Sequence, residues 1–157
     1  MRRKEREVTD RKQIEKIMEL CSCCRIGFCD EGKIYIVPVN FGYEYGKDSC
    51  TIYFHGAQEG RKFELIKEEP EVGFEMDTSY QVKTADVACG YSSYFQSIIG
   101  TGRVTVVEDN DEKIYGLNRI MKHVSGQSEW SYEESMLRSA GVFKLKAEEM
   151  SCKEQQR

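Results

Sequence analysis

The chain has 157 residues, 39% hydrophobic and 32% charged, with a net charge of −4 at pH 7. This length predicts a single domain with a sizeable core, and the acidic balance disfavours nucleic acid as a main partner. The sequence contains no run of about 18 apolar residues that could span a membrane. Its charged start, MRRKEREVTD, lacks the apolar segment of a secretory signal. We therefore expect a cytoplasmic protein.

The first half of the chain predicts an arm, a helix and successive hairpins. Residues 1–8 are charged and predict an exposed arm, and Thr9 or Asp10 can cap a helix that runs to about Cys21. Three strands follow, joined by turn-forming residues, at about 24–29, 34–41 and 50–54. The second of these is largely apolar on both faces, so we expect it to be covered on both sides.

The second half predicts further strands and helices before a polar tail. A helix begins near Glu59 and is stopped by Pro70. The remaining elements are strands at about 72–77 and 95–107, helices at about 109–124 and 131–139, the second with a Ser131–Glu134 capping box, and a last strand from Val142. Gly100 and Gly102, inside a strand, indicate a bulge or close backbone contact. Residues 151–157 are predicted to fray. Successive hairpins favour an antiparallel barrel.

Seven cysteines raise the question of a metal site, because three of them cluster in the segment CSCC at residues 21–24. A structural zinc site usually needs two ligand pairs at CxxC-like spacing, and no second pair exists. We interpret the cysteines as reduced thiols, several of which act as small hydrophobic residues. The sequence predicts no metal.

The sequence pattern that most clearly indicates a binding site lies between the strand at 50–54 and the helix that follows it. Two glycines there, Gly56 and Gly60, allow close approach of the backbone to a ligand. The free N–H groups of the helix start gather with the cations of Arg61 and Lys62, which is the chemistry of a phosphate site. Spacing alone leaves a second interpretation open, in which both cations are simply solvated.

The two histidines have different interpretations. His55 ends a strand beside this loop, where an imidazole could donate to a ligand, relay a proton or ligate a metal. A hydrogen-bonded structural role for His55 is equally consistent with the sequence. His123, late in a helix, is interpreted as structural. Gly100-Thr101-Gly102 fails as a dinucleotide fingerprint, since no helix follows it.

Three blocks of the sequence, in order, resemble the nitroimidazole-resistance (Nim) proteins: VPVNFGYE, YFHGAQEGRKFELI and YSSYFQSIIGTGRVTVVED. The Nim proteins belong to the flavin-binding split-barrel group related to pyridoxamine 5′-phosphate oxidase. The resemblance covers nearly the whole chain. It implies a mainly β fold, a six-stranded antiparallel Greek-key split barrel with flanking helices, and a homodimer with FMN or FAD in the grooves between subunits.

By position, the resemblance also implies three groups of cofactor-binding residues. These are Pro38, Val39, Asn40 and Phe41 for the flavin ring, partly through backbone; His55, Ala57, Gly60, Arg61 and Lys62 for the ribityl and phosphate end; and Gln96, Ser97 and Ile98 beside the cofactor. Gln96 and Gly60 depart from the pattern, because many split-barrel members carry Arg and Ser there. Phosphate binding would then depend more on the two cations and backbone N–H groups.

The implied activity is that of a flavin-dependent oxidoreductase that reduces 5-nitroimidazole-type nitro compounds, with His55 as proton donor or substrate orienter. The chain has no counterpart of the arginine-bearing terminal segment that holds the oxidase's substrate, so oxidation of vitamin B6 is not expected. A non-enzymatic protein that stores, carries or senses flavin would use the same binding residues. A third alternative is a haem-handling split barrel with His55 as an axial ligand.

Overall fold

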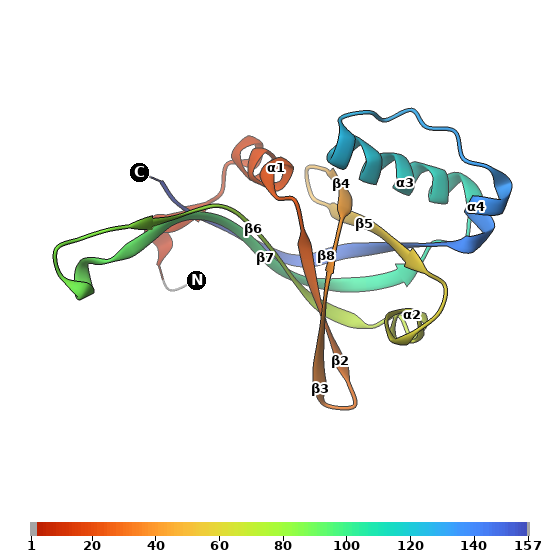
Figure 1. The fold of residues 1–157 in the computed structure, drawn as a ribbon, viewed down its shortest axis with the longest axis horizontal. Coiled ribbons are helices and arrows are strands. Elements are labelled where there is room, and N and C mark those ends of the chain that lie inside the picture. The colour runs from red at the N-terminus through yellow and green to blue at the C-terminus, as the bar shows by residue number, and fades with distance from the viewer. Residues whose placement is uncertain (1–2, 157) are drawn as a thin grey trace.

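An antiparallel sheet of eight strands organises the protein (Figure 1). The computed structural model describes residues 3–156. The strands are β1 (Glu7–Val8), β2 (Cys24–Asp30), β3 (Lys33–Val39), β4 (Phe41–Tyr45), β5 (Cys50–Ala57), β6 (Glu71–Lys83), β7 (Ser92–Val106) and β8 (Ala140–Gln155). The helices are α1 (Arg11–Leu20), α2 (Arg61–Lys67), α3 (Asn110–Ser125) and α4 (Glu134–Ser139), with short 3-10 turns η1 (Lys4–Arg6) and η2 (Ala88–Gly90). The mainly β prediction is confirmed, although there are eight strands rather than six.

The edges of the sheet approach each other where β3 passes into β4. The strand order is β3-β2-β6-β7-β8-β5-β4, with β1 paired to β8 off this path, so β3 and β4 lie at opposite ends. Asn40 alone separates these two strands in the sequence. The sheet must therefore curl until its edges approach at Asn40, which gives a barrel-like form. The prediction of one continuous strand over 34–41 is wrong, because β3 pairs with β2 whereas β4 pairs with β5.

Alternating apolar residues fill the inside of the curled sheet. β2 shows the alternation clearly, since every second residue of Cys24–Phe28 is buried. α1 covers one end of this core with the fully buried Ile17 and Met18. Its predicted cap is confirmed, because the Asp10 carboxylate accepts a 2.8 Å hydrogen bond from the backbone N–H of Gln13.

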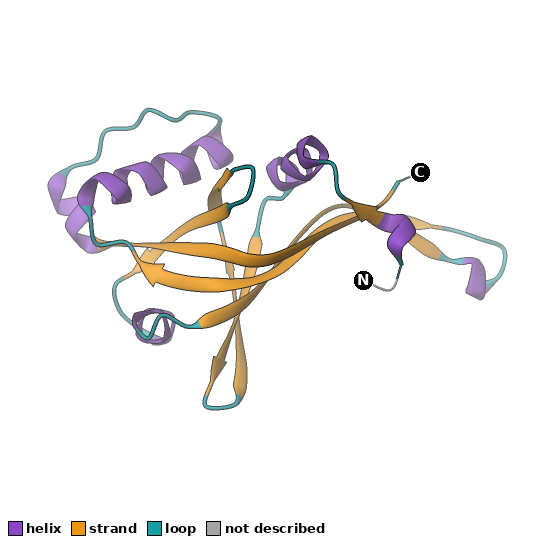
Figure 2. Ribbon diagram, turned by 180° about the vertical axis from the view of Figure 1, so that it is seen from behind, coloured by secondary structure: helices purple, strands orange, loops and turns teal. Residues whose placement is uncertain are grey.

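β6 and β7 extend beyond the rest of the sheet as a long hairpin arm, with η2 near its tip (Figures 1 and 2). Two glycines of β7 lie where the backbone of β8 comes close. A Cβ atom on Gly100 would clash with Glu149 O, and one on Gly102 would clash with Lys146 O. The register between β7 and β8 shifts next to Gly102. The prediction that these glycines mark a bulge or close backbone contact is confirmed.

The tail predicted to fray at 151–157 is instead held in the sheet over its described residues, whereas the arm predicted at 1–8 is mostly exposed from residue 3 onward and pairs with β8 only at Glu7 and Val8. β8 pairs with β7 almost to the C-terminus, and Cys152 within it is buried. Val8 of β1 pairs with Cys152 from the other side. The end of β8 could not be predicted from its own sequence, because pairing with β7 and β1, and not apolar content, holds it in place. At residues 1, 2 and 157 both predictions lie outside the described residues.

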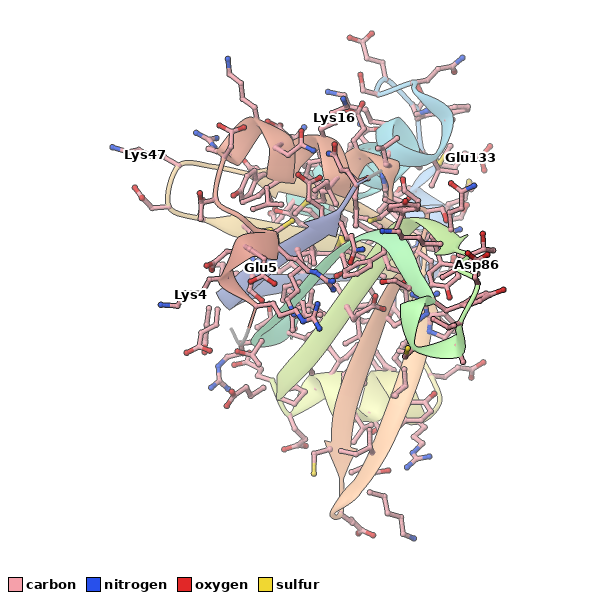
Figure 3. The ribbon with its side chains drawn as sticks, turned by 90° about the vertical axis from the view of Figure 1, so that its left-hand side faces the viewer. Lys4, Glu5, Lys16, Lys47, Asp86 and Glu133 are labelled. Carbon is pink, nitrogen blue, oxygen red and sulfur yellow. The ribbon has the colours of Figure 1, made fainter. Side chains whose placement is uncertain are left out.

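The start of α4 also differs from the prediction. Its N-cap is Glu133, with no side-chain hydrogen bond to the helix, so the predicted Ser131–Glu134 capping box is wrong. Glu133 instead stands at the surface, as do Lys16 and Lys47 (Figure 3). No helix among residues 3–156 is long and apolar enough to cross a membrane.

The outer face of β3 is open, which corrects the prediction that this strand is covered on both sides. Ile34 is 72% exposed and Ile36 is 59% exposed, whereas Tyr35 and Val37 pack against the core. The β2–β3 hairpin projects away from the rest of the sheet (Figures 1 and 3). Two apolar side chains on its outer face are therefore left without cover in the single chain.

Candidate functional site

The loop between β5 and α2 is shaped by two of its own residues. Gly60 has φ +83°, a left-handed conformation that glycine adopts without strain, and it is the N-cap of α2. Gln58 anchors the loop, because its Nε2 donates hydrogen bonds of 2.8 Å to Arg138 O and 2.9 Å to Ala140 O. The start of α2 is thereby fixed against the segment that joins α4 to β8. The predicted helix start near Glu59 is displaced only to Arg61.

Lys62 places its ammonium group directly over β5. A Cβ atom on Gly56 would clash with Lys62 Nζ, so the absence of a side chain at position 56 makes room for the cation. The Nζ atom also lies 5.8 Å from the centroid of the Phe143 ring. Partial burial lowers the pKa of Lys62 from its usual value. Within residues 3–156 no carboxylate forms an ion pair with Lys62.

His55 lies near the end of β5, one residue before Gly56, and the Lys62 charge acts on it. The side chain is exposed, but the surrounding protein removes part of its hydration, which lowers the pKa of His55, and the Lys62 charge lowers it further. The neutral imidazole is therefore favoured at neutral pH. Such a ring can donate one hydrogen bond and accept another.

The Arg61 side chain contacts the β2–β3 hairpin. Its Nη2 lies 2.6 Å from Asp30 Oδ2 and its Nε donates to the same oxygen at 2.7 Å. The guanidinium carbon lies 4.3 Å from the centroid of the Tyr35 ring. Arg61 thus joins α2 to the β2–β3 hairpin. The two cations that the sequence predicts as one anion site are adjacent, yet only Lys62 lacks a carboxylate partner within the described residues.

Residues 38–41, which are predicted to line a flavin ring, form the end of β3, the connecting residue Asn40 and the start of β4. Val39 is 8% exposed and Phe41 is fully buried, so both side chains belong to the core and only their backbone is available to a ligand. Pro38 and Asn40 are exposed.

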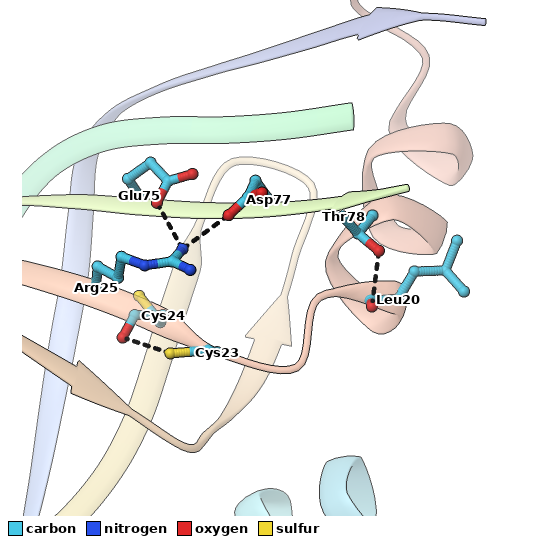
Figure 4. A network of polar contacts seen from close by, with 7 residues as sticks. All are labelled: Leu20, Cys23, Cys24, Arg25, Glu75, Asp77 and Thr78. Carbon is cyan, nitrogen blue, oxygen red and sulfur yellow. Dashed lines mark hydrogen bonds and ion pairs between the residues drawn. The ribbon is translucent and has the colours of Figure 1, made fainter. Parts of the chain in front are cut away.

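An ion-pair network steadies the strands beside the connection from β3 to β4 (Figure 4). Arg25 of β2 is the register partner of Pro38, and its Nη1 lies 3.0 Å from Glu75 Oε2 and 2.7 Å from Asp77 Oδ1, both on β6. Thr78, further along β6, donates a 3.2 Å hydrogen bond to the last carbonyl of α1. The network ties β2, β6 and α1 together.

The third predicted group lies far from the second group on the same chain. Gln96 is the β8 partner of Glu154, whereas His55 is the β8 partner of Val142. Twelve residues of β8 separate these partners, which corresponds to about 40 Å along an extended strand. The structure brings His55, Ala57, Gly60 and Lys62 together, and it places Gln96–Ile98 elsewhere. Ile98 is fully buried in the core.

Sequence reasoning missed Glu154, a carboxylate surrounded by amides. Its Oε2 accepts hydrogen bonds from the side-chain amides of Gln13 at 3.1 Å, Gln96 at 3.1 Å and Gln156 at 2.8 Å. Burial acts to raise the pKa of Glu154, but these bonds and the nearby Lys16 charge outweigh it, so the pKa is lowered. The signal that could have revealed this strand is Cys152, an apolar residue within an otherwise polar tail.

No group of three or more His, Cys, Asp or Glu side chains in residues 3–156 is arranged to hold a metal ion. The arrangement that the structure does present is a glycine-lined loop with an unpaired cation and a neutral histidine, suited to an anionic group on a small molecule.

A curled antiparallel sheet with this loop at the end of β5 defines a protein of the split-barrel class. Residues 10–154 match the family model described as pyridoxamine 5′-phosphate oxidase. The chain belongs to this family. No curated protein sequence matches it.

Several solved structures are similar to the chain. A proposed 5-nitroimidazole antibiotic resistance protein from Bacteroides thetaiotaomicron has 31% identity and a TM-score of 0.78, over 94% of this chain and 85% of that one. The flavocytochrome Anf3 from Azotobacter vinelandii has 18% identity and a TM-score of 0.78, over 96% and 70%. The FAD and haem binding protein from Mycobacterium smegmatis has 14% identity and a TM-score of 0.79, over 97% and 74%. The last two support the fold alone.

Proposed function

We propose that this protein binds a flavin, FMN or FAD, and holds its phosphate at the β5–α2 loop. The observation that carries the proposal is the Lys62 cation, which lies over Gly56 beside His55 without a carboxylate partner in the described chain. A phosphate can accept charge-assisted hydrogen bonds from such a cation. Membership of the pyridoxamine 5′-phosphate oxidase family supports this assignment.

We propose further that the flavin site forms between two copies of the chain. Gln96–Ile98 and the His55–Lys62 loop lie about 40 Å apart along β8, so one chain cannot bring them to one small molecule. In the proposed dimer, one chain supplies the His55–Lys62 loop and the second chain supplies Gln96–Ile98. The outer face of the sheet offers a surface for it, because Ile36, Pro38 and Ile99 stand there with Gly27 and Gly73 in neighbouring register positions. Exposed apolar side chains that share one sheet face are typical of an interface.

The reaction that we propose for this site is reduction of a nitro compound; the 31%-identical relative is named as a proposed 5-nitroimidazole antibiotic resistance protein. The flavin, when bound, supplies the electron transfer. Lys62 holds the anionic end of the cofactor, and Gly56 keeps the space for that cation. His55, with its neutral ring, orients the substrate or passes a proton at a ring nitrogen. An external reductant restores the reduced cofactor.

Turnover tests this function. Purified protein is mixed anaerobically with a reduced nicotinamide and a 5-nitroimidazole, and flavin absorbance and drug loss are followed together. We expect the flavin band to bleach with the donor and return with the drug, and His55→Gln to slow the return without changing flavin content. A flavin band that is indifferent to every donor and drug tried would leave the non-enzymatic carrier or sensor as the function.

A further inference from the structure

A cleft of about 430 Å³ lies between α1, β4 and α3. The two helices stand on the same side of the sheet with β4 between them (Figures 1 and 2). None of the residues that line the cleft belongs to the loop at Lys62 or to the segments predicted to bind flavin. The volume lies within the range of small-molecule sites. The cleft therefore requires its own explanation.

The two helical walls of the cleft carry opposite charges. Glu15 and Glu19, one turn apart, line it from α1, whereas Arg119 and Lys122 line it from α3. In the described part of the chain no ion pair joins the two walls. Each wall thus keeps a pair of like charges, an arrangement that disfavours the empty cleft and favours a counter-charge. Glu44 of β4 also lines it.

Tyr43 of β4 lines the cleft between the two helices, and charges on both walls affect the pKa of its hydroxyl group. Burial raises the pKa of Tyr43 to about 12, and Glu19 and Glu15 add to the increase while Arg119 opposes it. The phenol is consequently neutral across the physiological range. Its ring packs against the core and, edge-on, against His123, and the part that lines the cleft can contact an apolar spacer, while its hydroxyl can donate or accept a hydrogen bond.

The cleft is also held open by fixed contacts. His123 Nδ1 lies 2.7 Å from Phe41 O and its Nε2 lies 3.2 Å from Glu19 O. Both oxygens only accept, so a neutral ring donates to one of them, and the ring lies between β4 and α1. Arg119 is steered by Tyr115, whose hydroxyl accepts a 2.9 Å hydrogen bond from Arg119 Nε. The remaining guanidinium nitrogens are left for other partners. A site whose walls are positioned in advance loses less entropy on binding.

We propose that this cleft binds a small zwitterion whose ammonium and carboxylate groups lie at opposite ends of a flat apolar spacer. The ammonium meets Glu15 and Glu19, the carboxylate meets Arg119 and Lys122, and the spacer lies on Tyr43. A ligand with one charge satisfies one wall and leaves the other uncompensated. The site is independent of the proposed flavin site.

Calorimetric titration of the full-length protein, as purified with its cofactor content, tests this proposal. The probe is 4-(aminomethyl)benzoate, with benzylamine and benzoate as analogues that each lack one charge. We expect the zwitterion to bind at least tenfold more tightly than either analogue. Glu19→Gln should weaken the zwitterion and benzylamine but not benzoate, and Lys122→Gln should weaken the zwitterion and benzoate but not benzylamine.

A matched control is Lys12→Gln, which changes a charge on an exposed part of α1 that does not line the cleft. It should leave all three affinities unchanged. Thermal unfolding of each variant shows whether the fold is intact, and flavin content reports separately on the Lys62 site. Equal affinity for the three probes, no binding of the zwitterion at millimolar concentration, or identical effects of both charge variants on every probe would overturn the proposal.

Discussion

Arg61 and Asp30 form an ion pair in which Nη2 lies 2.6 Å from Oδ2, and this contact ties the start of α2 to the end of β2. The next residue, Lys62, has no such partner among residues 3–156. Two neighbouring cations in one motif therefore have different roles. Arg61 stabilises the hairpin beside the loop, and Lys62 is the cation that remains for a ligand.

Neutralising Lys62 should weaken flavin binding more than neutralising Arg61. Charge-assisted hydrogen bonds contribute about 1.5–3 kcal/mol, so Lys62→Gln should raise the flavin Kd by about tenfold or more. Arg61→Gln should have a smaller effect on the Kd, because that cation is already paired with Asp30. Fluorescence titration of the apoprotein with FMN and FAD measures both. Equal losses in the two variants would show that Arg61 leaves Asp30 when the flavin binds.

Adding a methyl group at Gly56 should reduce flavin binding by displacing Lys62. A Cβ atom there clashes with Nζ of the lysine, which must then leave its place over β5. We expect Gly56→Ala to weaken flavin binding by about tenfold, the value of one lost interaction of about 1.4 kcal/mol. In a Lys62→Ala background the same substitution should change flavin affinity little. A full additional loss in that background would contradict the proposed link.

Acid should destabilise the protein partly through His55. Its pKa in the folded state is lowered by partial burial and by Lys62, so below about pH 6.5 the unfolded chain binds the proton more readily. Above that pH the protonation of His55 does not affect the free energy of unfolding. As the pH falls from 6.5 toward the folded-state pKa, proton uptake by the unfolded chain lowers the free energy of unfolding. Urea unfolding of wild type and His55→Gln at pH 7.5 and pH 5 measures this. The wild type should lose more stability than the variant.

Thiol reactivity should divide the seven cysteines by burial. Burial raises the pKa of Cys21, Cys24 and Cys50 to about 12 and that of Cys152 to about 11, so their thiolates are scarce at pH 8. The exposed residues Cys29 and Cys89 should react first with a disulfide reagent, followed by the partly exposed Cys23. The four buried thiols should react only in denaturant. Mass spectrometry of alkylated peptides identifies each site, and early labelling of Cys24 would argue against the packing described.

A charge on the outer face of β3 should prevent dimer formation and flavin binding together. Ile36 is 59% exposed on the face proposed for the second copy, so Ile36→Glu places a carboxylate in that interface. Sedimentation equilibrium should then give a monomer with little flavin. The matched control is Val124→Glu on α3, which is 57% exposed but away from this face. An Ile36→Glu monomer that binds flavin fully would place the site within one chain.

Local sequence patterns predict the elements of the fold well where a residue's own neighbours decide its structure. The Asp10 cap and the β2–β3 turn depend on nearby chain, and both agree with the structure. Asn40 shows the limit. The apolar pattern predicts one strand through Asn40, but the chain there passes from one edge of the sheet to the other. The arrangement of the whole curled sheet determines this change.

The candidate site was predictable in its location but not in its details. GRK and the preceding glycines indicate an anion site, whereas the pairing of Arg61 with Asp30 depends on a hairpin about thirty residues earlier. Glu154 escaped notice for a related reason. Its three amide partners come from α1, β7 and the chain end, and no local pattern brings them together.

Flavin binding is the central claim, and the most direct measurement is the flavin content of the freshly purified protein. Denaturation followed by absorbance and chromatography gives both the amount and the identity, FMN or FAD. We predict about one flavin per chain, or uptake to that level when the apoprotein is titrated, with a marked loss in Lys62→Gln. Protein that carries no flavin and takes up neither FMN nor FAD would contradict the account, leaving the split-barrel fold with a different ligand at Lys62.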